Sequence, residues 1–398
     1  MRSLKRLMRK LLSSPVKMAL SDAENAIYQN TLKYVTEISL NLMAVKVVNR
    51  PEDFLSWCAE LLKICRQEVN VDLLEPEQFR PLKKIQDILE NGISVSQLKM
   101  LRIAPWPIFV DFIKQQESLH ALDERLKLLS HINEIKHTPL ADMIEEDRLA
   151  FTGKHTSNHD HSIYNFDVEW FASTRGAKVF HQLLQQNPIA FDNALAHIPL
   201  EGEVTFTHYQ SFITDYQAIF KKAEEKSPLA PATRLLAMRR SDQFIGLTNT
   251  KIDALCQGLS IAKFSNQDFL SYWQDMIGTM RTFAWWHQAE PEQADELALW
   301  QARAILIDVF LFADESLAQN SNYLKVRDRA LNIKTAKTNA SSVARKRTKE
   351  SAEMLVDRAL SADDLPEYLQ EKRNTIINEV KNGKSVDHVI GLMRAIFG

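Results

Sequence analysis

The sequence predicts a mainly α-helical protein of two helical bodies joined by a polar linker, with a small helical piece at the C-terminal end. Glycine and proline are scarce, at 10 and 13 of 398 residues, against roughly 7% and 5% in an average protein. Tight turns between strands depend on both residue types. Long stretches also repeat apolar residues at intervals of three and four, the period of an amphipathic helix. Both observations favour helices over strands.

Changes in composition along the chain suggest its domain boundaries. Pro105 and Pro107 bracket Trp106, so we expect a helix to break there, and Glu203–Thr207 is the best candidate for a short strand. The predicted divisions are a basic amphipathic N-terminal segment (1–17), an N-terminal helical domain (18–145), a polar histidine-rich linker (146–165), a second helical domain (166–324), a basic connector (325–349) and a C-terminal helical piece (350–398).

The three cysteines, Cys58, Cys65 and Cys256, are too few for a disulfide framework. Cys58 and Cys65 fall on one predicted helix, roughly 10 Å apart along its axis, which is too far for a bond between them. Buried, reduced thiols are the expected state, and they indicate a cytoplasmic protein. No apolar run approaches the ~18 residues of a membrane span, so we expect no integral membrane segment.

The net charge of −2 conceals an uneven distribution. Residues 1–17 carry six lysines or arginines and no acid, and residues 325–349 carry nine against the single acid Asp328. Taking this +6 and +8 out of the total leaves −16 on the other 356 residues. The sequence therefore predicts acidic helical bodies with two basic segments attached, which favours a polyanionic partner.

The N-terminal segment 1–17 has its leucines on one predicted helical face and its basic residues on the other. Such a helix can lie on an anionic membrane surface, bind nucleic acid or dock onto the acidic body of its own chain. These three alternatives stay open.

The basic connector contains few large apolar residues, so it buries little surface to offset its ordering entropy. Arg345, Lys346, Arg347 and Lys349 would suit a phosphate backbone, because each neutralised phosphate releases condensed counterions. The alternative is a solvated charge run without a ligand.

A second candidate interface is the stretch "FIGLTNTKIDAL", which invites comparison with the helix-hairpin-helix motif of DNA-binding proteins. Gly246 and Leu247 match the glycine-rich turn, but Thr248 stands where the second glycine belongs. Arg239, Arg240 and Lys251, with Arg234 nearby, would then supply phosphate contacts. The alternative is a solvated helix edge.

The stretch "GKHTSNHDHSIYNFD" raises the question of a metal site, since it holds His155, His159 and His161. A zinc site needs three or four ligands, and the nearby carboxylates are only Asp160 and Asp167. Serine, asparagine and aspartate favour turns over helix in this stretch. We therefore expect a polar linker with solvent-exposed histidines and no metal.

Catalytic motifs do not appear in the sequence: there is no P-loop, G-x-G-x-x-G, G-x-S-x-G, H-E-x-x-H or C-x-x-C pattern. We accordingly assign no catalytic residue and no cofactor. A hydrolase or nuclease whose catalytic residues are dispersed along the sequence is a third hypothesis, which we rank below two non-catalytic ones.

Residues 229–314 carry a family resemblance. They include the segments "TRLLAMRRSDQFIGLTNTKIDALCQGLSI", "YWQDMIGTMRTFAWW" and "LWQARAILIDVF". This region resembles a module of uncharacterised bacterial proteins encoded with restriction and phage-defence systems. The resemblance implies a bacterial cytoplasmic setting and a nucleic-acid context.

Two functional hypotheses follow from the charge distribution and this resemblance. The first is a nucleic-acid-associated, non-catalytic component of a bacterial defence system against phage or plasmid DNA, with backbone contacts to DNA and protein partners encoded nearby. The second is an α-helical scaffold or adaptor whose acidic bodies bind other proteins.

Overall fold

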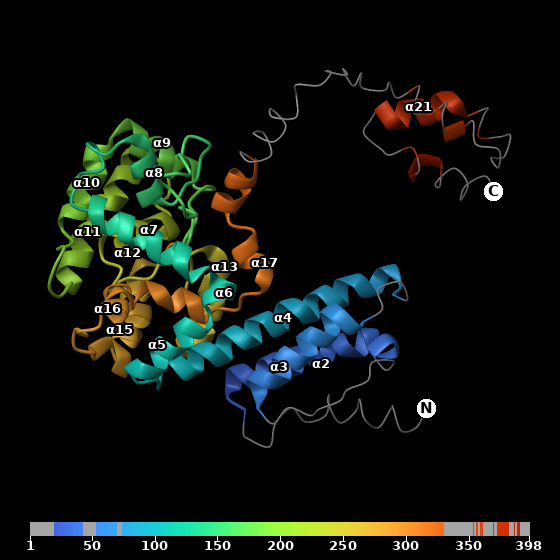
Figure 1. The fold of residues 1–398 in the computed structure, drawn as a ribbon, viewed down its shortest axis with the longest axis horizontal. Helices are drawn as coiled ribbons and strands as arrows, with labels where there is room; N and C mark the ends of the chain where they lie inside the picture. The colour runs from blue at the N-terminus through green and yellow to red at the C-terminus, as the bar shows by residue number, and fades with distance from the viewer. Residues whose placement is uncertain are drawn as a thin grey trace. The chain divides into compact units, whose positions relative to one another are not determined.

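The computed structural model describes residues 20–42, 53–69 and 74–329, together with 372–381 and single positions between 353 and 390 (Figure 1). The described residues are predominantly helical and contain no strand, which confirms the mainly α fold class. The chain divides into two compact units, Met1–Ala330 and Leu331–Gly398. This division lies inside the predicted basic connector 325–349.

Three helices lie side by side at the start of the first unit (Figure 1). Asp53 caps the second of them by accepting a hydrogen bond from the Ser56 backbone at 2.7 Å. Trp57 and Cys58 face Ile85 and Leu89 in a shared apolar core. The helices are α2 (Asp22–Leu42), α3 (Phe54–Lys63, continued by the π-helix η1, Ile64–Glu68) and α4 (Pro76–Leu101).

The next group of helices begins after the proline break that the sequence predicts. α4 ends at Leu101, and Pro105 is the N-cap of the following helix, which starts at Trp106. The apolar residues from Leu119 to Ile132 are divided between two helices, because Ala121 adopts a left-handed conformation. These helices are α5 (Trp106–Gln115), α6 (Glu117–His120), α7 (Leu122–Ile135) and α8 (Glu145–Thr152).

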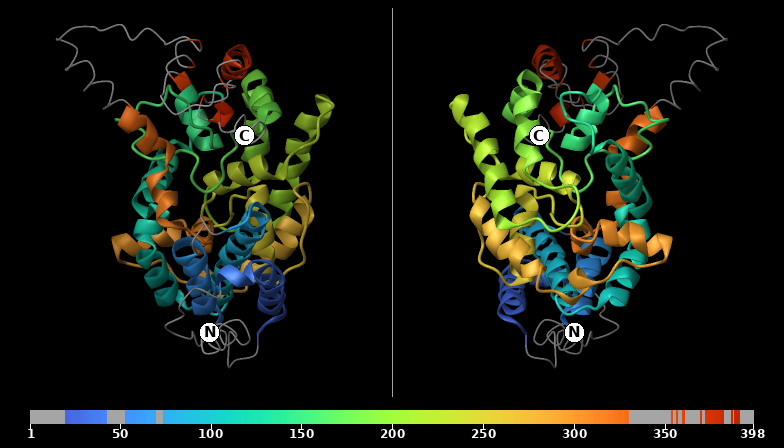
Figure 2. Two further views of the ribbon diagram at one scale, coloured as in Figure 1. Left: turned by 90° about the vertical axis from the view of Figure 1, so that its right-hand side faces the viewer. Right: turned by 90° about the vertical axis from the view of Figure 1, so that its left-hand side faces the viewer.

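A long irregular connection, 153–177, leads from α8 to the remaining helices of the unit, as the side views of Figure 2 show. The longer helices that follow are α9 (Lys178–Gln186), α10 (Pro188–Ala196), α11 (Phe206–Lys222), α12 (Leu229–Arg239) and α13 (Asn249–Leu259). Shorter elements complete it: α14 (Phe269–Ser271), the π-helix η3 (Tyr272–Ile277), α15 (Gly278–Met280), the 3₁₀ helix η4 (Ala284–His287), α16 (Ala294–Gln301), the 3₁₀ helix η5 (Ile305–Phe310) and α17 (Glu315–Gln319).

The predicted arrangement of two bodies on either side of 146–165 is not confirmed. One hydrophobic core runs from Leu98 to Phe310 and includes residues before, within and after that stretch. Phe151 and Tyr164, both in the predicted linker, are buried in this core. The stretch is polar on average, but its few large apolar side chains supply the contacts that hold it against the helices.

The predicted strand at Glu203–Thr207 is wrong, since these residues are irregular up to the start of α11 at Phe206. Thr205 is the N-cap of that helix, and its hydroxyl accepts a hydrogen bond from the His208 backbone at 3.4 Å. Threonine favours strands and helix caps alike, so the threonines of this segment did not distinguish a strand from the start of a helix.

The tryptophans between 273 and 300 belong to the hydrophobic core or pack against it. Trp273, Trp285 and Trp286 are all buried. The Arg281 guanidinium lies 4.6 Å from the Trp273 ring centre, in cation–π geometry.

The second unit has its own small core. Val356, Leu360, Leu369, Ile376, Ile377 and Val389 form it. Ile376 and Ile377 lie on α21 (Arg373–Lys381), in agreement with a C-terminal helical piece at 350–398.

Candidate functional site

The candidate site is a cavity of about 600 Å³ in the first unit. Its walls come from α4, α6, the start of α7, the segment 169–173, the N-terminal end of α13, and η5 with the residues after it. Small-molecule sites in proteins usually measure roughly 300–1,000 Å³, so this cavity has the size of a metabolite site.

Three charged side chains form the floor of this cavity. Asp308, on η5, is 3% exposed. Its carboxylate accepts a hydrogen bond from Arg125 Nη1 at 2.6 Å and another from Lys251 Nζ. Burial opposes ionisation of Asp308, but Lys251 and Arg125 outweigh it and lower the pKa of the carboxyl. The floor therefore contains two cations and one carboxylate.

Lys251 reaches the floor from the first turn of α13, and Arg125 from the first turn of α7. Lys251 Nζ also donates to the Phe171 carbonyl at 2.6 Å, and Arg125 Nε donates to the His120 carbonyl at 2.7 Å. The Arg125 guanidinium stacks at 4.4 Å on the Trp170 ring centre. Through these bonds the two cations connect the end of α6, the segment at Phe171 and η5, which carries Asp308.

His120 lies beside this cluster at the end of α6 and is 2% exposed. Burial, with Arg125 close by, lowers the pKa of its imidazole to about 4, so the ring is neutral near pH 7. Its Nδ1 is buried and has no hydrogen-bond partner among the described residues. Buried polar atoms are nearly always paired, which makes this nitrogen a candidate ligand contact.

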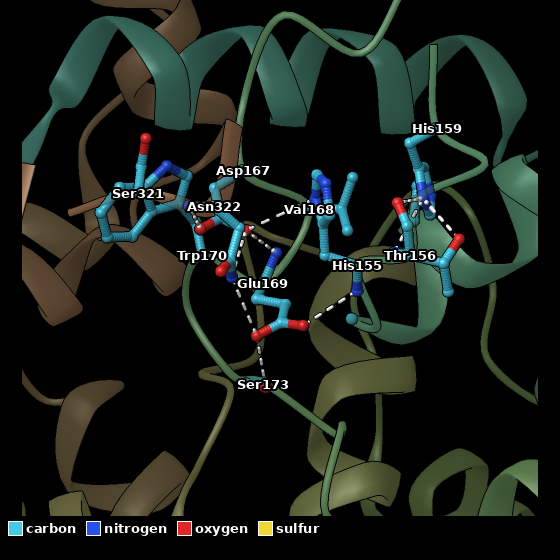
Figure 3. A network of polar contacts seen from close by, with 12 residues as sticks. His155, Thr156, His159, Asp167, Val168, Glu169, Trp170, Ser173, Ser321 and Asn322 are labelled. Atoms are coloured by element: carbon cyan, nitrogen blue, oxygen red, sulfur yellow. Dashed lines mark hydrogen bonds and ion pairs between the residues drawn. The ribbon is translucent and has the colours of Figure 1, made fainter. Parts of the chain in front are cut away.

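A network of polar contacts that includes the carboxylates of Asp167 and Glu169 (Figure 3) adjoins the cavity, because Glu169 and Trp170 also line it. Glu124 accepts hydrogen bonds from Trp170 Nε1 at 3.0 Å and from the Ser321 hydroxyl at 3.1 Å. Asp167 accepts from the Asn322 backbone at 2.6 Å. Burial raises the pKa of Glu124. These bonds tie the segment at 167–170 to the helical residues 322–329, close to the end of the first unit.

Glu169 connects this network to the histidine-rich stretch, as Figure 3 also shows. It accepts a hydrogen bond from the His155 backbone at 2.9 Å. It also pairs with Arg175 at 2.7 Å. Since Glu169 also lines the cavity, the stretch 153–167 indirectly supports the cavity wall.

The histidines themselves are not solvent-exposed, contrary to the prediction. His159 is 3% exposed and the His155 side chain 6%, while His161 is half-buried. The rings of His155 and His159 stack with their centres 5.0 Å apart, and His159 Nδ1 accepts a hydrogen bond from the Thr156 backbone at 3.1 Å. The turn composition was interpreted correctly, but the His159 ring packs edge-on against Tyr164 and stacks on His155.

Within the described ranges, no group of three or more histidine, cysteine, aspartate or glutamate side chains is placed to hold a metal ion.

The structure also corrects the predicted phosphate contacts of Arg239 and Arg240. Arg240 is 5% exposed, and its guanidinium is occupied by Asp242 and by the carbonyls of Pro199 and Gly202. Arg239 donates to the carbonyls of Ile198 and Lys136, both at 3.2 Å. These guanidiniums connect parts of the fold, so they are not presented to a nucleic-acid backbone.

Lys251 lines the cavity and is not on an outer helix edge, so it does not provide the exposed phosphate contact expected of a helix-hairpin-helix. The Leu247 backbone N–H, which that motif would offer to a phosphate, donates to the Thr233 hydroxyl at 2.9 Å. Arg345, Lys346, Arg347 and Lys349 lie outside the described residues, and their role stays a prediction.

Sequence reasoning missed Asp308, Arg125 and His120 as site residues. The available signal was Asp308 itself, an acid inside the apolar run "ARAILIDVFLF", because a buried carboxylate requires a partner. Nothing in the sequence indicates that the partners lie 183 and 57 residues away.

The fold and the cavity place the protein in a class: a mainly α-helical protein whose first unit contains an open cavity lined by both charged and apolar side chains. No family model, no curated protein and no solved structure matches the chain. Among the described residues, no helix is both long and apolar enough to cross a membrane.

The buried histidines give a testable pH dependence. Burial lowers the pKa of both His120 and His181 to about 4, so the unfolded chain binds protons more readily. Their contribution to stability is complete above about pH 6.5 and is lost as the pH falls toward 4. Between pH 7 and pH 5.5 we expect each histidine to lower the free energy of unfolding by about 1 kcal/mol.

Urea denaturation at pH 7 and pH 5.5 measures this loss. The double variant His120→Gln with His181→Gln should show a smaller difference between the two pH values than the wild type. Equal differences would contradict the assignment of the pH dependence to these two rings.

Proposed function

We propose that the protein is a nucleic-acid-associated, non-catalytic component of a bacterial defence system against phage or plasmid DNA. It acts in the cytoplasm, through contacts to the DNA backbone and through protein partners encoded nearby. The observation that carries the proposal is the +8 charge of residues 325–349 on a chain whose other residues, outside 1–17, sum to −16. Segregation of this kind is typical of chains that bind a polyanion through one segment.

The corrected positions of Arg239, Arg240 and Lys251 narrow the proposed interface. Because these three residues are bonded inside the first unit, the predicted phosphate contacts that stay in the proposal are those of the basic connector, Arg345, Lys346, Arg347 and Lys349. Each lysine or arginine that neutralises a phosphate adds to affinity without sequence preference. The proposed role is therefore general binding of nucleic acid, with any selectivity supplied by partners.

Fluorescence anisotropy with a labelled 30-base-pair duplex tests the proposal. We expect replacement of all four cluster residues by alanine to weaken binding at least tenfold at low salt, because the variant can no longer neutralise four phosphates. A matched control removes four exposed lysines of the first unit, Lys178, Lys221, Lys222 and Lys226, with the same change in net charge.

The two variants separate the proposal from its alternatives. Binding that falls equally in both would show a response to net charge alone and would refute the assigned interface. If the wild type binds neither duplex nor single strands, the proposal fails and the scaffold hypothesis takes its place.

A further inference from the structure

We propose that the cavity around Asp308 is a binding site for a nucleoside phosphate, with the phosphate group at Lys251 and the N-terminal end of α13. This inference is independent of the proposed nucleic-acid function, because it concerns a small molecule inside the first unit and uses none of the connector residues.

The charge of the cavity floor is the first argument. Arg125 and Lys251 share the single carboxylate of Asp308, which leaves one positive charge uncompensated in a largely buried place. The Lys251 side chain is still 24% exposed, whereas those of Arg125 and Asp308 are 3% and 4% exposed. Lys251 is therefore the floor cation that a ligand can reach. Buried charges are normally paired, and an anionic group would complete the pairing.

The N-terminal end of α13 supplies the second argument. Thr248 is the N-cap residue, but its side chain does not cap the helix backbone; it lies 3.0 Å from the Thr250 hydroxyl instead. Thr248, Thr250 and Lys251 all line the cavity. An uncapped helix start with a lysine and two hydroxyls in its first turn is a favourable environment for phosphate.

His120 provides an independent indication of a ligand. It is buried and lines the same cavity, and its Nδ1 has no hydrogen-bond partner among the described residues. A neutral imidazole pairs with a hydroxyl or an N–H group and not specifically with an anion. The ligand should therefore have a hydroxyl-bearing part beside its phosphate, as a ribose does.

The rim of the cavity differs from the floor and orients the ligand. Asp87, Glu90 and Glu169 line it, together with the amide of Asn91. These acids also pair with cations, with Lys83 at 2.9 Å, Arg66 at 2.7 Å and Arg175 at 2.7 Å respectively. Such a rim accepts hydrogen bonds, so it suits the amino groups of a base and disfavours a second anionic group.

The size and the apolar surface of the cavity agree with a nucleotide. Its volume of about 600 Å³ exceeds what inorganic phosphate or a single amino acid would fill. Trp170, Phe171 and Phe312 contribute apolar surface, against which a base can be buried.

Isothermal titration calorimetry on the full chain tests the proposal with AMP, GMP, adenosine and inorganic phosphate. We expect at least one of the two nucleotides to bind tenfold or more tightly than both adenosine and inorganic phosphate. Adenosine binding as tightly as AMP would overturn the phosphate assignment. No binding of either nucleotide at millimolar concentration would overturn the site altogether.

Two variants locate the binding. Lys251→Met removes the reachable floor cation and leaves the Arg125–Asp308 pair, and Thr250→Val removes one hydroxyl with little change in volume. We expect at least a tenfold loss of nucleotide affinity for Lys251→Met and a smaller loss for Thr250→Val. Lys263→Met is the control, because Lys263 is exposed, does not line the cavity and pairs with Asp253 at 2.9 Å.

Thr250→Val keeps the test valid if Lys251→Met fails to fold. If nucleotide affinity is unchanged in each of these two variants that folds, the site is refuted.

The variant in which Arg345, Lys346, Arg347 and Lys349 are replaced by alanine should bind the nucleotide as the wild type does. A loss of nucleotide binding in that variant would place the nucleotide on the connector and refute the cavity proposal, while leaving the nucleic-acid function intact.

Discussion

Replacing Arg234 with methionine should lower the free energy of unfolding by about 4 kcal/mol or more, because it leaves several buried carbonyls unpaired at about 1–3 kcal/mol each. Arg234 lies on α12 and is fully buried. Its guanidinium donates hydrogen bonds to four backbone carbonyls, those of Ala150, Phe151, Val168 and Trp170. These carbonyls belong to the end of α8 and to the irregular connection, so one side chain fixes both.

The local geometry leaves little room for compensation at this position. Gly153 has a φ of +80°, and an added Cβ there would lie 2.6 Å from the Ala172 carbonyl oxygen and 3.1 Å from Arg234 Nε. The backbone is thus closely packed around the guanidinium. Burial lowers the pKa of Arg234 to about 9, so it remains charged near pH 7.

Urea denaturation measures the effect, and Arg239→Met is the matched control on the same helix. Arg239 is partly buried and donates to two carbonyls only, so its replacement should cost about 1–2 kcal/mol. If the two variants lose equal amounts of the free energy of unfolding, the four hydrogen bonds from Arg234 to backbone carbonyls do not stabilise the fold more than the two from Arg239.

The second large effect is expected for Asp308→Asn. This change preserves the shape of the side chain but leaves Arg125 and Lys251 without their shared carboxylate. Breaking a buried ion pair from one side typically costs about 3–5 kcal/mol, since a buried charge is left uncompensated. We expect a loss of that size in the free energy of unfolding, measured by urea denaturation near pH 7.

A double-variant cycle identifies the cause of this loss. Adding Lys251→Met to Asp308→Asn removes one of the two uncompensated cations, so the double variant should be more stable than Asp308→Asn alone. If Lys251→Met lowers the free energy of unfolding of the Asp308→Asn variant by as much as it lowers that of the wild type, charge does not hold the cluster together.

Local features were predictable from the sequence because they depend on neighbouring residues. The scarcity of glycine and proline indicated the fold class, and Pro105 marked the start of α5. The repeat of apolar residues at intervals of three and four predicted amphipathic helices, and on α7 Leu129 and Ile132 are buried. Each of these signals lies within a few turns of helix.

The site was not predictable, because it is assembled from distant residues. Asp308 meets Arg125 across 183 positions, and Arg234 meets Ala150 across 84. The sequence alone does not distinguish an arginine that is buried in the fold from one that binds phosphate. Arg240 was predicted to contact phosphate, but it is buried. The burial of His159 likewise depends on which helices cover a turn, and the composition of the turn carries no information on that.

The slope of duplex affinity against salt concentration tests the proposed function most directly. Removing one phosphate-binding side chain should reduce the slope of log K against log salt by about 1. The wild type should therefore have a slope roughly three to four larger in magnitude than the variant lacking Arg345, Lys346, Arg347 and Lys349, while the four-lysine control keeps the wild-type slope. Identical slopes for the wild type and the connector variant would contradict the proposed interface.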